Sequence, residues 1–271
     1  MWSSVDVTDG KAVRAALEKL QPSAVYHCAG IADVHGAWTA SARVLRVNVI
    51  GTHTLLEALD ELRVRVPVVI TGSALVYRTS PEPLSEASPI GPSSPYGLSK
   101  LAQEMLADSA AGPIIVARSF NHAGPRQSAH YVTSSFARQI AEAEAGRREP
   151  VLRVGNLDAR RDITDVRDTV RAYRLLVEHG RPGQAYNVCR GEAHRVGDLL
   201  DLLLTQARTR VRVETDPERL RPSDNPVVLG DPSRIRQDTG WSARIPIDRT
   251  LGDLLDYWRH HIRAADSSSS A

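Results

Sequence analysis

The pair formed by Tyr96 and Lys100 has the residue types and the spacing to move a proton. A helix is predicted to begin at this point, and residues four apart lie on one face of a helix. A phenol titrates near ~10, and a neighbouring ammonium favours the phenolate, which lowers that pKa toward working pH. The simpler alternative is a surface contact between the two side chains. Because Lys11 and Lys19 are the only other lysines, a chance Tyr-x-x-x-Lys is rare, and we favour the acid–base interpretation.

Short apolar segments alternate with helical segments around this pair. The apolar runs end in small or polar residues and are 24–30, 67–73 and 113–118. The predicted helices are 11–20, 40–62 and the one that carries Tyr96 and Lys100. We also expect residues 5–10 to be a strand end that runs into a turn, with Thr8 or Asp9 capping the next helix. This alternation predicts an α/β fold with a parallel sheet covered on both faces.

Ligands of such sheets bind at the carboxyl ends of the strands. The residues that follow the predicted strands share that edge: Asp6, Cys28, Ala29, Gly30, Ser73, Asn121 and His122. Tyr96 and Lys100 would lie above them. The sequence therefore predicts one site assembled from several separate segments.

Composition excludes several classes of partner. The formal charge of the 271 residues is +2 and the arginines are scattered, so no basic stripe indicates nucleic acid binding. No apolar run is long enough to span a membrane and no signal-peptide pattern is present, so we expect a cytoplasmic protein. Cys28 and Cys189 show no metal-ligand spacing and are predicted to be buried free thiols.

The combination of Ser73 at a strand end with Tyr-x-x-x-Lys on the following helix resembles the extended short-chain dehydrogenase/reductase family. This family comprises nucleotide-sugar epimerases, dehydratases and reductases with a Rossmann-like, doubly wound sheet. The resemblance implies that Tyr96 exchanges a proton with a sugar oxygen, while Lys100 lowers its pKa and binds the nicotinamide ribose. Ser73 would hydrogen-bond the reacting oxygen. Taken alone, Ser73 is equally explained as a serine that satisfies a strand-end amide.

The second half of the chain extends the resemblance to GDP-sugar enzymes. Residues 118–127 look like the family's Arg-x-Phe-Asn-His-x-Gly-Pro-x-Gln segment, and 154–168 resemble GDP-mannose 4,6-dehydratases and GDP-6-deoxymannose reductases. Similar segments continue to 255–258, so the resemblance covers nearly the whole chain. It implies five substrate-binding residues. Asn121 and Asn156 would hold the sugar diphosphate, Arg161 and Arg221 the nucleotide phosphate or ribose, and Asp224 the guanine.

The alternative for each of these arginines is a surface ion pair with an acid such as Asp162 or Asp165. Arginine forks bind phosphate oxygens in the same bidentate way as carboxylates, so residue type alone does not separate the two roles.

Leu75 separates a reductase from a dehydratase. The 4,6-dehydratases place a glutamate two residues after the catalytic serine or threonine, because removal of the C5 proton needs a carboxylate near the sugar. Leucine cannot move a proton, and Glu82 and Glu86 are predicted to be solvated in the following loop. We therefore expect NAD(P)H-dependent reduction of GDP-4-dehydro-6-deoxy-D-mannose to GDP-D-rhamnose, with NADPH slightly favoured. The alternatives are a GDP-mannose 4,6-dehydratase, a nucleotide-sugar 4-epimerase and a non-catalytic nucleotide-sugar-binding chain.

The family begins with a strand and a Gly-x-x-Gly-x-x-Gly loop that receives the pyrophosphate, and this sequence contains no such fingerprint. We therefore expect an N-terminally truncated form whose Rossmann-like sheet lacks its first strand. The cofactor contacts that remain by resemblance are Asp6, Val7, Ala29, Gly30, Tyr96 and Lys100.

The expected organisation has two main regions and a tail. Residues 1–120 would form the dinucleotide-binding Rossmann region, and 121–265 a nucleotide-sugar-binding region that partly returns to the sheet. Residues 266–271 are small and polar and predicted to be disordered. In the family, the helices that correspond to 40–62 and 96–110 pair across a two-fold axis, which implies a homodimer built on a four-helix bundle.

Overall fold

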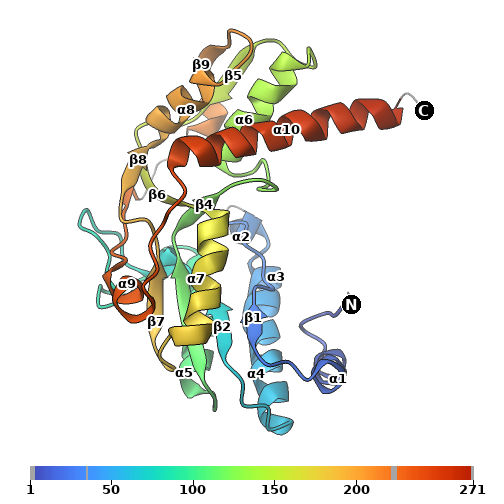
Figure 1. The fold of residues 1–271 in the computed structure, drawn as a ribbon, viewed down its shortest axis with the longest axis vertical. Coiled ribbons are helices and arrows are strands. Elements are labelled where there is room, and N and C mark those ends of the chain that lie inside the picture. The colour runs from blue at the N-terminus through green and yellow to red at the C-terminus, as the bar shows by residue number, and fades with distance from the viewer. Residues whose placement is uncertain (1–3, 35, 221–224, 270–271) are drawn as a thin grey trace.

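The computed structural model shown in Figure 1 describes residues 4–34, 36–220 and 225–269. A four-stranded parallel sheet with the order β1-β2-β3-β7 lies in the lower part of the view. Its strands are β1 (Val25–His27), β2 (Val68–Thr71), β3 (Ile114–Ser119) and β7 (Ala185–Val188). The predicted α/β fold with a parallel sheet is confirmed.

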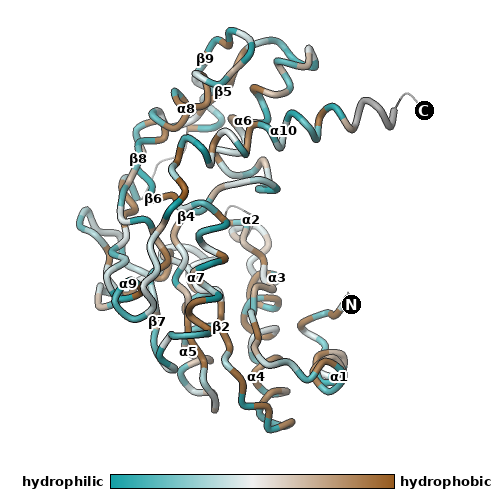
Figure 2. Tube along the Cα trace, viewed as in Figure 1, coloured by the Kyte–Doolittle hydropathy of each residue, from teal (hydrophilic) through white to brown (hydrophobic). Residues whose placement is uncertain are grey.

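Both faces of this sheet are covered by helices. One face packs on α1 (Gly10–Leu20), α4 (Gly51–Glu61) and α5 (Pro95–Ser109), and the other on α7 (Val166–His179) and α9 (Ser233–Thr239). In β2, Val68 and Ile70 contact the first set of helices, whereas Val69 contacts the second. This double burial explains why the strands are continuous apolar runs. Figure 2 shows these hydrophobic stretches along β2 and the helix α4.

The first described residues form a turn where the sequence predicts a strand end. Asp6 accepts hydrogen bonds from the backbone nitrogen and the hydroxyl of Thr8, at 2.9 and 2.8 Å. This local bonding competes with strand formation, so the predicted turn is confirmed but the strand end before it is not. Asp9 then caps α1 by accepting from the backbone nitrogens of Lys11 and Ala12, so the predicted cap is confirmed.

The predicted helix 40–62 is divided into three segments. These segments are α3 (Ser41–Leu45), the π-helical segment η1 (Arg46–Ile50) and α4. A separate short helix, α2 (Gly36–Thr39), precedes them. Within η1, the fully buried Asn48 accepts a hydrogen bond from the backbone nitrogen of Ile31 at 2.7 Å and donates to the Ser99 hydroxyl at 2.9 Å. A wide π turn therefore places a polar side chain inside the fold.

A second hydrophobic core lies in the upper part of Figure 1, where α6 (Val132–Glu144), α8 (Val196–Thr205) and α10 (Ile247–Ser269) pack together. The strands of this half are β4 (Asn121–Ala123), β5 (Val151–Val154), β6 (Arg160–Asp165), β8 (Ala193–Arg195), β9 (Arg212–Thr215) and β10 (Val227–Val228). Strand β6 pairs with β4, β8 and β10, while β5 pairs with β9. Helix α10 continues to Ser269, past residue 266, where the sequence predicts a disordered tail.

In the described part of the chain, the remaining helical elements are two 3-10 turns, η2 (Ala74–Val76) and η3 (Pro217–Arg219). Among the described residues, no helix combines the length and the apolar character needed to cross a bilayer.

Candidate active site

Ser73 stands where β2 ends and the turn η2 begins. Its hydroxyl caps the turn by accepting from the backbone nitrogen of Leu75 at 3.1 Å. Across from this turn, α5 begins at Pro95, and the Ser94 hydroxyl caps it by accepting from the backbone nitrogen of Gly97. Proline in the first turn and a serine cap explain why α5 begins here. The first turn of α5 therefore presents Tyr96 beside the turn that Ser73 caps.

Burial controls the protonation of Tyr96. The residue is 8% exposed, and this burial raises the pKa of the phenol well above its ordinary value. A hydrogen bond with the Ser73 side chain opposes that shift, while the nearby phenols of Tyr131 and Tyr173 add to it. Tyr96 is therefore a neutral phenol, ready to donate a proton, and the lowering of its pKa that we expected from Lys100 is not found.

Lys100 lies one helical turn further along α5. Its ammonium is 5.8 Å from the centre of the Tyr96 ring and donates to the backbone carbonyl of Thr71 at 2.8 Å. Burial lowers the pKa of Lys100 to about 8. The structure thus brings Ser73, Tyr96 and Lys100 together at the end of β2.

The predicted cofactor-binding residues surround the π segment η1. A Cβ atom on Gly30 would lie 3.1 Å from Asn48 Oδ1 and 3.7 Å from Lys100 Nζ, so this backbone passes directly beside Lys100. Ala29 and Gly30 are exposed. At the other end of η1, Val7 packs against Gly51 so closely that a Cβ there would lie 2.6 Å from a Val7 methyl.

Asp6 precedes Val7 and is exposed. The hydrogen bonds from Thr8 lower its pKa, with a smaller contribution from the charge of Arg46 on η1. Cys28 is also exposed at the end of β1, which corrects the prediction of a buried thiol, whereas Cys189 is buried as predicted.

Three of the predicted substrate-binding residues lie in the second half of the fold. Asn121 is exposed on β4, which pairs with β6, the strand that carries Arg161. Arg161 donates to the backbone carbonyls of Arg160 and Pro226, at 2.8 and 3.4 Å, and burial lowers its pKa. Asn156 is exposed in the loop before β6 and accepts from the backbone nitrogen of Asp158. Arg221 and Asp224 lie outside the described residues.

The acids considered as ion-pair partners for these arginines have other roles. Asp162 is fully buried, with a pKa raised by burial to about 6, and accepts from the backbone nitrogens of Arg190, Gly191 and Gly230. Asp165 caps α7 and binds the guanidinium of Arg167. Both carboxylates therefore hold the backbone and helix ends of this half in place.

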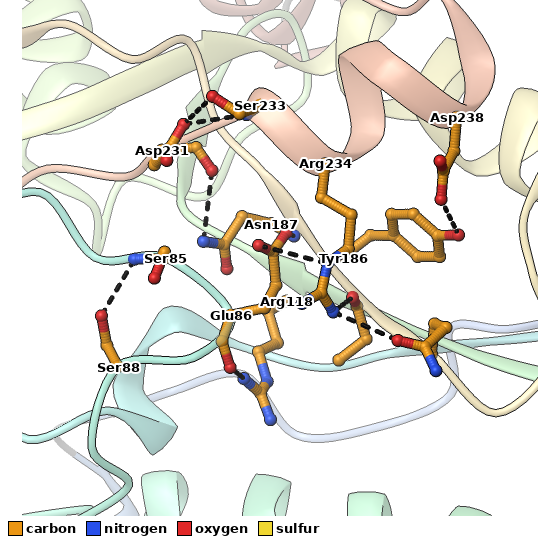
Figure 3. A network of polar contacts seen from close by, with 12 residues as sticks. Ser85, Glu86, Ser88, Arg118, Tyr186, Asn187, Asp231, Ser233, Arg234 and Asp238 are labelled. Atoms are coloured by element: carbon orange, nitrogen blue, oxygen red, sulfur yellow. Dashed lines mark hydrogen bonds and ion pairs between the residues drawn. The ribbon is translucent and has the colours of Figure 1, made fainter.

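Glu86 is not solvated, contrary to prediction. Its side chain is 5% exposed, and its two oxygens face the backbone nitrogen of Asn187 at 2.7 Å and the guanidinium of Arg234 at 3.6 Å (Figure 3). Glu82 is exposed as predicted. The carboxylate of Glu86 is thus used to fix its loop against β7.

Sequence reasoning missed three polar residues at the site. Asn48 binds the backbone after β1, the Tyr173 hydroxyl lies 2.6 Å from that of Ser119, and the Tyr131 hydroxyl donates to the Ala32 carbonyl at 3.1 Å. Burial raises the pKa of Tyr173 to about 12. Asn48 could have been found from the sequence, since it is a polar residue on the buried side of a predicted helix. No pattern in the sequence identifies the two tyrosines.

These features define a class of protein. The chain is an NAD(P)-dependent nucleotide-sugar oxidoreductase of the extended short-chain dehydrogenase/reductase class. The sequence model of the GDP-mannose 4,6 dehydratase family matches residues 1–254, and the chain belongs to this family.

Proteins with different activities are similar to this chain. The chain is 36% identical to a GDP-6-deoxy-D-mannose reductase of Pseudomonas aeruginosa over 249 residues, which cover 89% of the chain and 82% of the relative. It is 26% identical to GDP-mannose 4,6 dehydratase 1 of Arabidopsis thaliana over 265 residues, 93% of the chain and 72% of the relative.

Solved structures give the same fold. The structure of RMD from Pseudomonas aeruginosa complexed with NADPH superimposes with a TM-score of 0.90 at 33% identity, covering 96% of this chain and 88% of that one. UDP-glucose 4-epimerase from Thermus thermophilus in complex with NAD gives a TM-score of 0.82 at 25% identity, with coverages of 94% and 83%. Both relatives hold a nicotinamide cofactor.

Proposed function

We propose that the protein reduces a 4-keto GDP-sugar, GDP-4-dehydro-6-deoxy-D-mannose, to GDP-D-rhamnose. The observation that carries this proposal is Leu75. It lies in η2, two residues after Ser73, and packs in the hydrophobic cluster that contains Tyr96. An acid at this position would stand beside the sugar, whereas leucine leaves the neighbourhood of Tyr96 suited to proton donation and not to C5 deprotonation. The similarity to the Pseudomonas reductase supports the same conclusion.

The residues around Lys100 fit a nicotinamide nucleotide. Gly30 lets the backbone pass close to Lys100 where a side chain would crowd Asn48 Oδ1. An ammonium has three donors, so Lys100 can bind Thr71 and a ribose together. We propose that Asp6 and Val7 contact the adenine, Ala29 and Gly30 the dinucleotide, and Lys100 the ribose. NADPH is the favoured form because RMD was solved with it.

In the proposed reaction, Tyr96 Oη donates its proton to the C4 oxygen of the keto sugar. The nicotinamide, when bound, supplies the hydride that adds to C4, so that the carbonyl becomes a hydroxyl. Ser73 orients the same oxygen by hydrogen bonding, and the Lys100 cation stabilises the phenolate that remains on Tyr96. A buried phenol with a raised pKa is in the protonated form that reduction requires.

The substrate nucleotide is proposed to lie over the second half of the fold. Asn121 and Asn156 would bind the diphosphate, Arg161 and Arg221 the phosphate or ribose, and Asp224 the guanine. In this assignment, residues 1–120 mainly serve the cofactor and residues 121–265 the sugar nucleotide. Tyr131 and Tyr173 of the second region lie near Tyr96 of the first.

The test is a turnover assay of the purified chain with NADPH and the 4-keto GDP-sugar, with product analysis by NMR. NADPH consumption with formation of GDP-rhamnose is the expected result. Release of a 4-keto sugar from GDP-mannose would indicate the dehydratase alternative, and interconversion of C4 epimers the epimerase alternative. Binding of the GDP-sugar with no reaction and no NADPH binding would identify a non-catalytic binding protein.

We also propose a homodimer through α4 and α5. Apolar side chains are exposed along this surface: Leu98 and Met105, on α5, are 52% and 65% exposed, and Ile50, next to α4, is 49% exposed. Apolar side chains on two neighbouring helices are the kind of surface that a four-helix bundle covers.

A further inference from the structure

A buried guanidinium lies between the two segments that carry the proposed catalytic groups. Arg118 is near the end of β3 and is 8% exposed. One segment is the start of α5, with Tyr96 and Lys100, and the other is the turn η2, which Ser73 caps. The proposed mechanism leaves Arg118 without a function, although a charge buried this deeply needs partners.

On one side, Arg118 binds Glu104 of α5. The guanidinium Nε lies 3.1 Å from both carboxylate oxygens, and a terminal nitrogen lies 2.7 Å from Oε2. Glu104 is one helical turn beyond Lys100 and two turns beyond Tyr96, on the same face of the helix. This two-pronged ion pair therefore fixes the face of α5 that carries the acid–base pair.

On the other side, Arg118 binds the segment that follows η2. It donates to the Tyr77 hydroxyl at 2.9 Å and to the Glu86 carbonyl at 3.3 Å, and its carbon lies 4.9 Å from the centre of the Tyr77 ring. Tyr77 directly follows η2 and donates in turn to Asn187 at 2.7 Å. Figure 3 shows Arg118, Glu86 and Asn187 within this network.

The start of α5 and the turn η2 also contact each other directly, so a shift of one displaces the other. A Cβ atom on Gly97 would lie 2.4 Å from the Leu75 carbonyl oxygen, and one on Gly72 would lie 3.2 Å from Glu104 Oε1. With contacts this close, the position of the Ser73 turn depends on how α5 is held.

We propose that Arg118 is a positioning residue for the proposed reduction. Its fork joins Glu104 of α5 to Tyr77 at the end of η2 and so keeps the Ser73 hydroxyl against Tyr96, with a fixed negative charge one turn from Lys100. The kinetic test of this inference, by kcat, rests on the proposed function. A second test, by the pKa of Lys100, rests on the geometry alone.

The pKa of Lys100 depends on the charges around it and can be measured without turnover. Burial lowers the pKa of Lys100, whereas Cys28 and Glu104 each raise it. Burial raises the pKa of Glu104, with a further increase from Asp108, and this rise is opposed by Arg118 and Lys100. Arg118 thus lowers the pKa of Glu104 and favours its ionised form, which in turn favours the cationic form of Lys100.

The experiment removes both members of the pair, in the double variant Arg118→Met, Glu104→Gln. Because neither member of the ion pair is left behind as an unpaired buried charge, the fold is expected to tolerate this change better than either single substitution. The matched control is Arg259→Met, Glu144→Gln. That pair has the same 2.7 Å separation and side chains 10% and 8% exposed, against 10% and 7% at the site, but it joins α10 to α6.

In the site variant, kcat is expected to fall at least about tenfold with KM for the sugar within about twofold, because positioning of the reacting groups is lost and binding is kept. The control variant should retain wild-type kcat. The single variant Arg118→Lys keeps Glu104 and should lose less kcat than the double variant. Its kcat should still be below that of the wild type, since an ammonium lacks the planar fork.

The second readout is an NMR titration of lysine carbons labelled with 13C, which needs no turnover. The chain has only Lys11, Lys19 and Lys100, so three signals are expected, and Lys100 is identified by its replacement. Its pKa should fall below the wild-type value of about 8 in the site variant and stay unchanged in the control.

The proposal is overturned if the site variant keeps kcat within about twofold of the wild type, or if both double variants lose kcat equally. If the wild-type chain shows no reduction at all, the proposed function fails by itself. The Lys100 titration then decides the inference, and an unchanged Lys100 pKa in the site variant overturns it.

Discussion

Burial acts on the two residues of the acid–base pair in opposite directions. It raises the pKa of the Tyr96 phenol and lowers the pKa of the Lys100 ammonium, in each case by disfavouring the charged form. At neutral pH the phenol is protonated and the ammonium is still mostly charged. This is the pair of protonation states with which a reductase begins its cycle.

Replacing Tyr96 with phenylalanine removes the proposed proton donor. Reduction should fall by about 10²- to 10⁴-fold, the usual contribution of a positioned general acid, while affinity for the GDP-sugar is retained. Turnover assays and calorimetric titration with the sugar nucleotide measure the two quantities. Tyr257→Phe on α10 is the control, and unchanged turnover of the Tyr96 variant would remove Tyr96 from the mechanism.

The rate should depend on pH through Lys100. Its folded pKa of about 8 means that the cation that stabilises the Tyr96 phenolate is present below that value and is lost above it. We expect kcat to decline as the pH rises through about 8. Lys100→Arg keeps a cation in alkaline solution, so its residual activity should lack this decline; the same alkaline decline in this variant would contradict the assignment.

His27 makes the fold sensitive to acid. It is buried on β1 beside the Thr52 hydroxyl at 2.8 Å, and burial lowers its pKa from 6.5 to about 4. An unfolded chain takes up this proton below about 6.5, the folded chain only below about 4, so stability is lost as pH falls through this window.

The expected loss between pH 7 and pH 5 is about 2 kcal/mol of unfolding free energy from this residue alone. Urea unfolding at the two pH values measures it. His27→Gln keeps a donor for Thr52 and has no proton to take up, so its loss over the same interval should be smaller. An equal loss in both proteins would show that other groups cause the acid sensitivity.

At the scale of the elements, η1 connects the loops proposed to hold the cofactor. Asn48→Ala removes three hydrogen bonds, which join the side chain to the backbone nitrogen and carbonyl of Ile31 and to Ser99. Unfolding free energy should fall by about 1–3 kcal/mol, since buried groups are left unsatisfied.

The Asn48→Ala variant should also bind NADPH more weakly, because the Gly30 backbone is no longer held beside Lys100. Fluorescence titration measures the affinity, and Ser99→Ala, which removes one of the three bonds, should give a smaller effect on both quantities. Full NADPH affinity in the Asn48 variant would exclude η1 as a support of the cofactor site.

The elements that the sequence predicts best are those with a continuous physical signal. The run from Val68 to Ile70 is apolar because both of its faces are buried, and the cap at Asp9 follows from side-chain chemistry within three residues. Asn48 stands out in the sequence as a polar residue on the buried side of a predicted helix, but its partner, the backbone of Ile31, was not predictable because it lies 17 residues away.

The same distinction applies to the site. The type and spacing of Tyr96 and Lys100 are local, and the structure brings them to Ser73. Glu86 was misassigned because the groups that bury it, Asn187 and Arg234, come from β7 and α9, more than a hundred residues away. Local pattern shows that a loop carries an acid, and only the tertiary contacts show which way the acid points.

At the scale of the whole molecule, the proposed homodimer has a direct test. Met105→Glu places a charge on the most exposed apolar position of α5 and should convert the dimer to a monomer with unchanged unfolding of the subunit. Analytical ultracentrifugation measures the mass. Val170→Glu on α7, at a residue 59% exposed, is the control and should leave the dimer intact. A wild-type chain that sediments as a monomer contradicts the proposal.

The hydrogen bond from Tyr131 to Ala32 joins the start of α6 to the loop after β1, and thus the two halves of the molecule. A single neutral hydrogen bond contributes only about 1 kcal/mol net to stability, so this link by itself holds the two halves together weakly. Such a bridge opens by thermal motion alone and needs no ligand to release it.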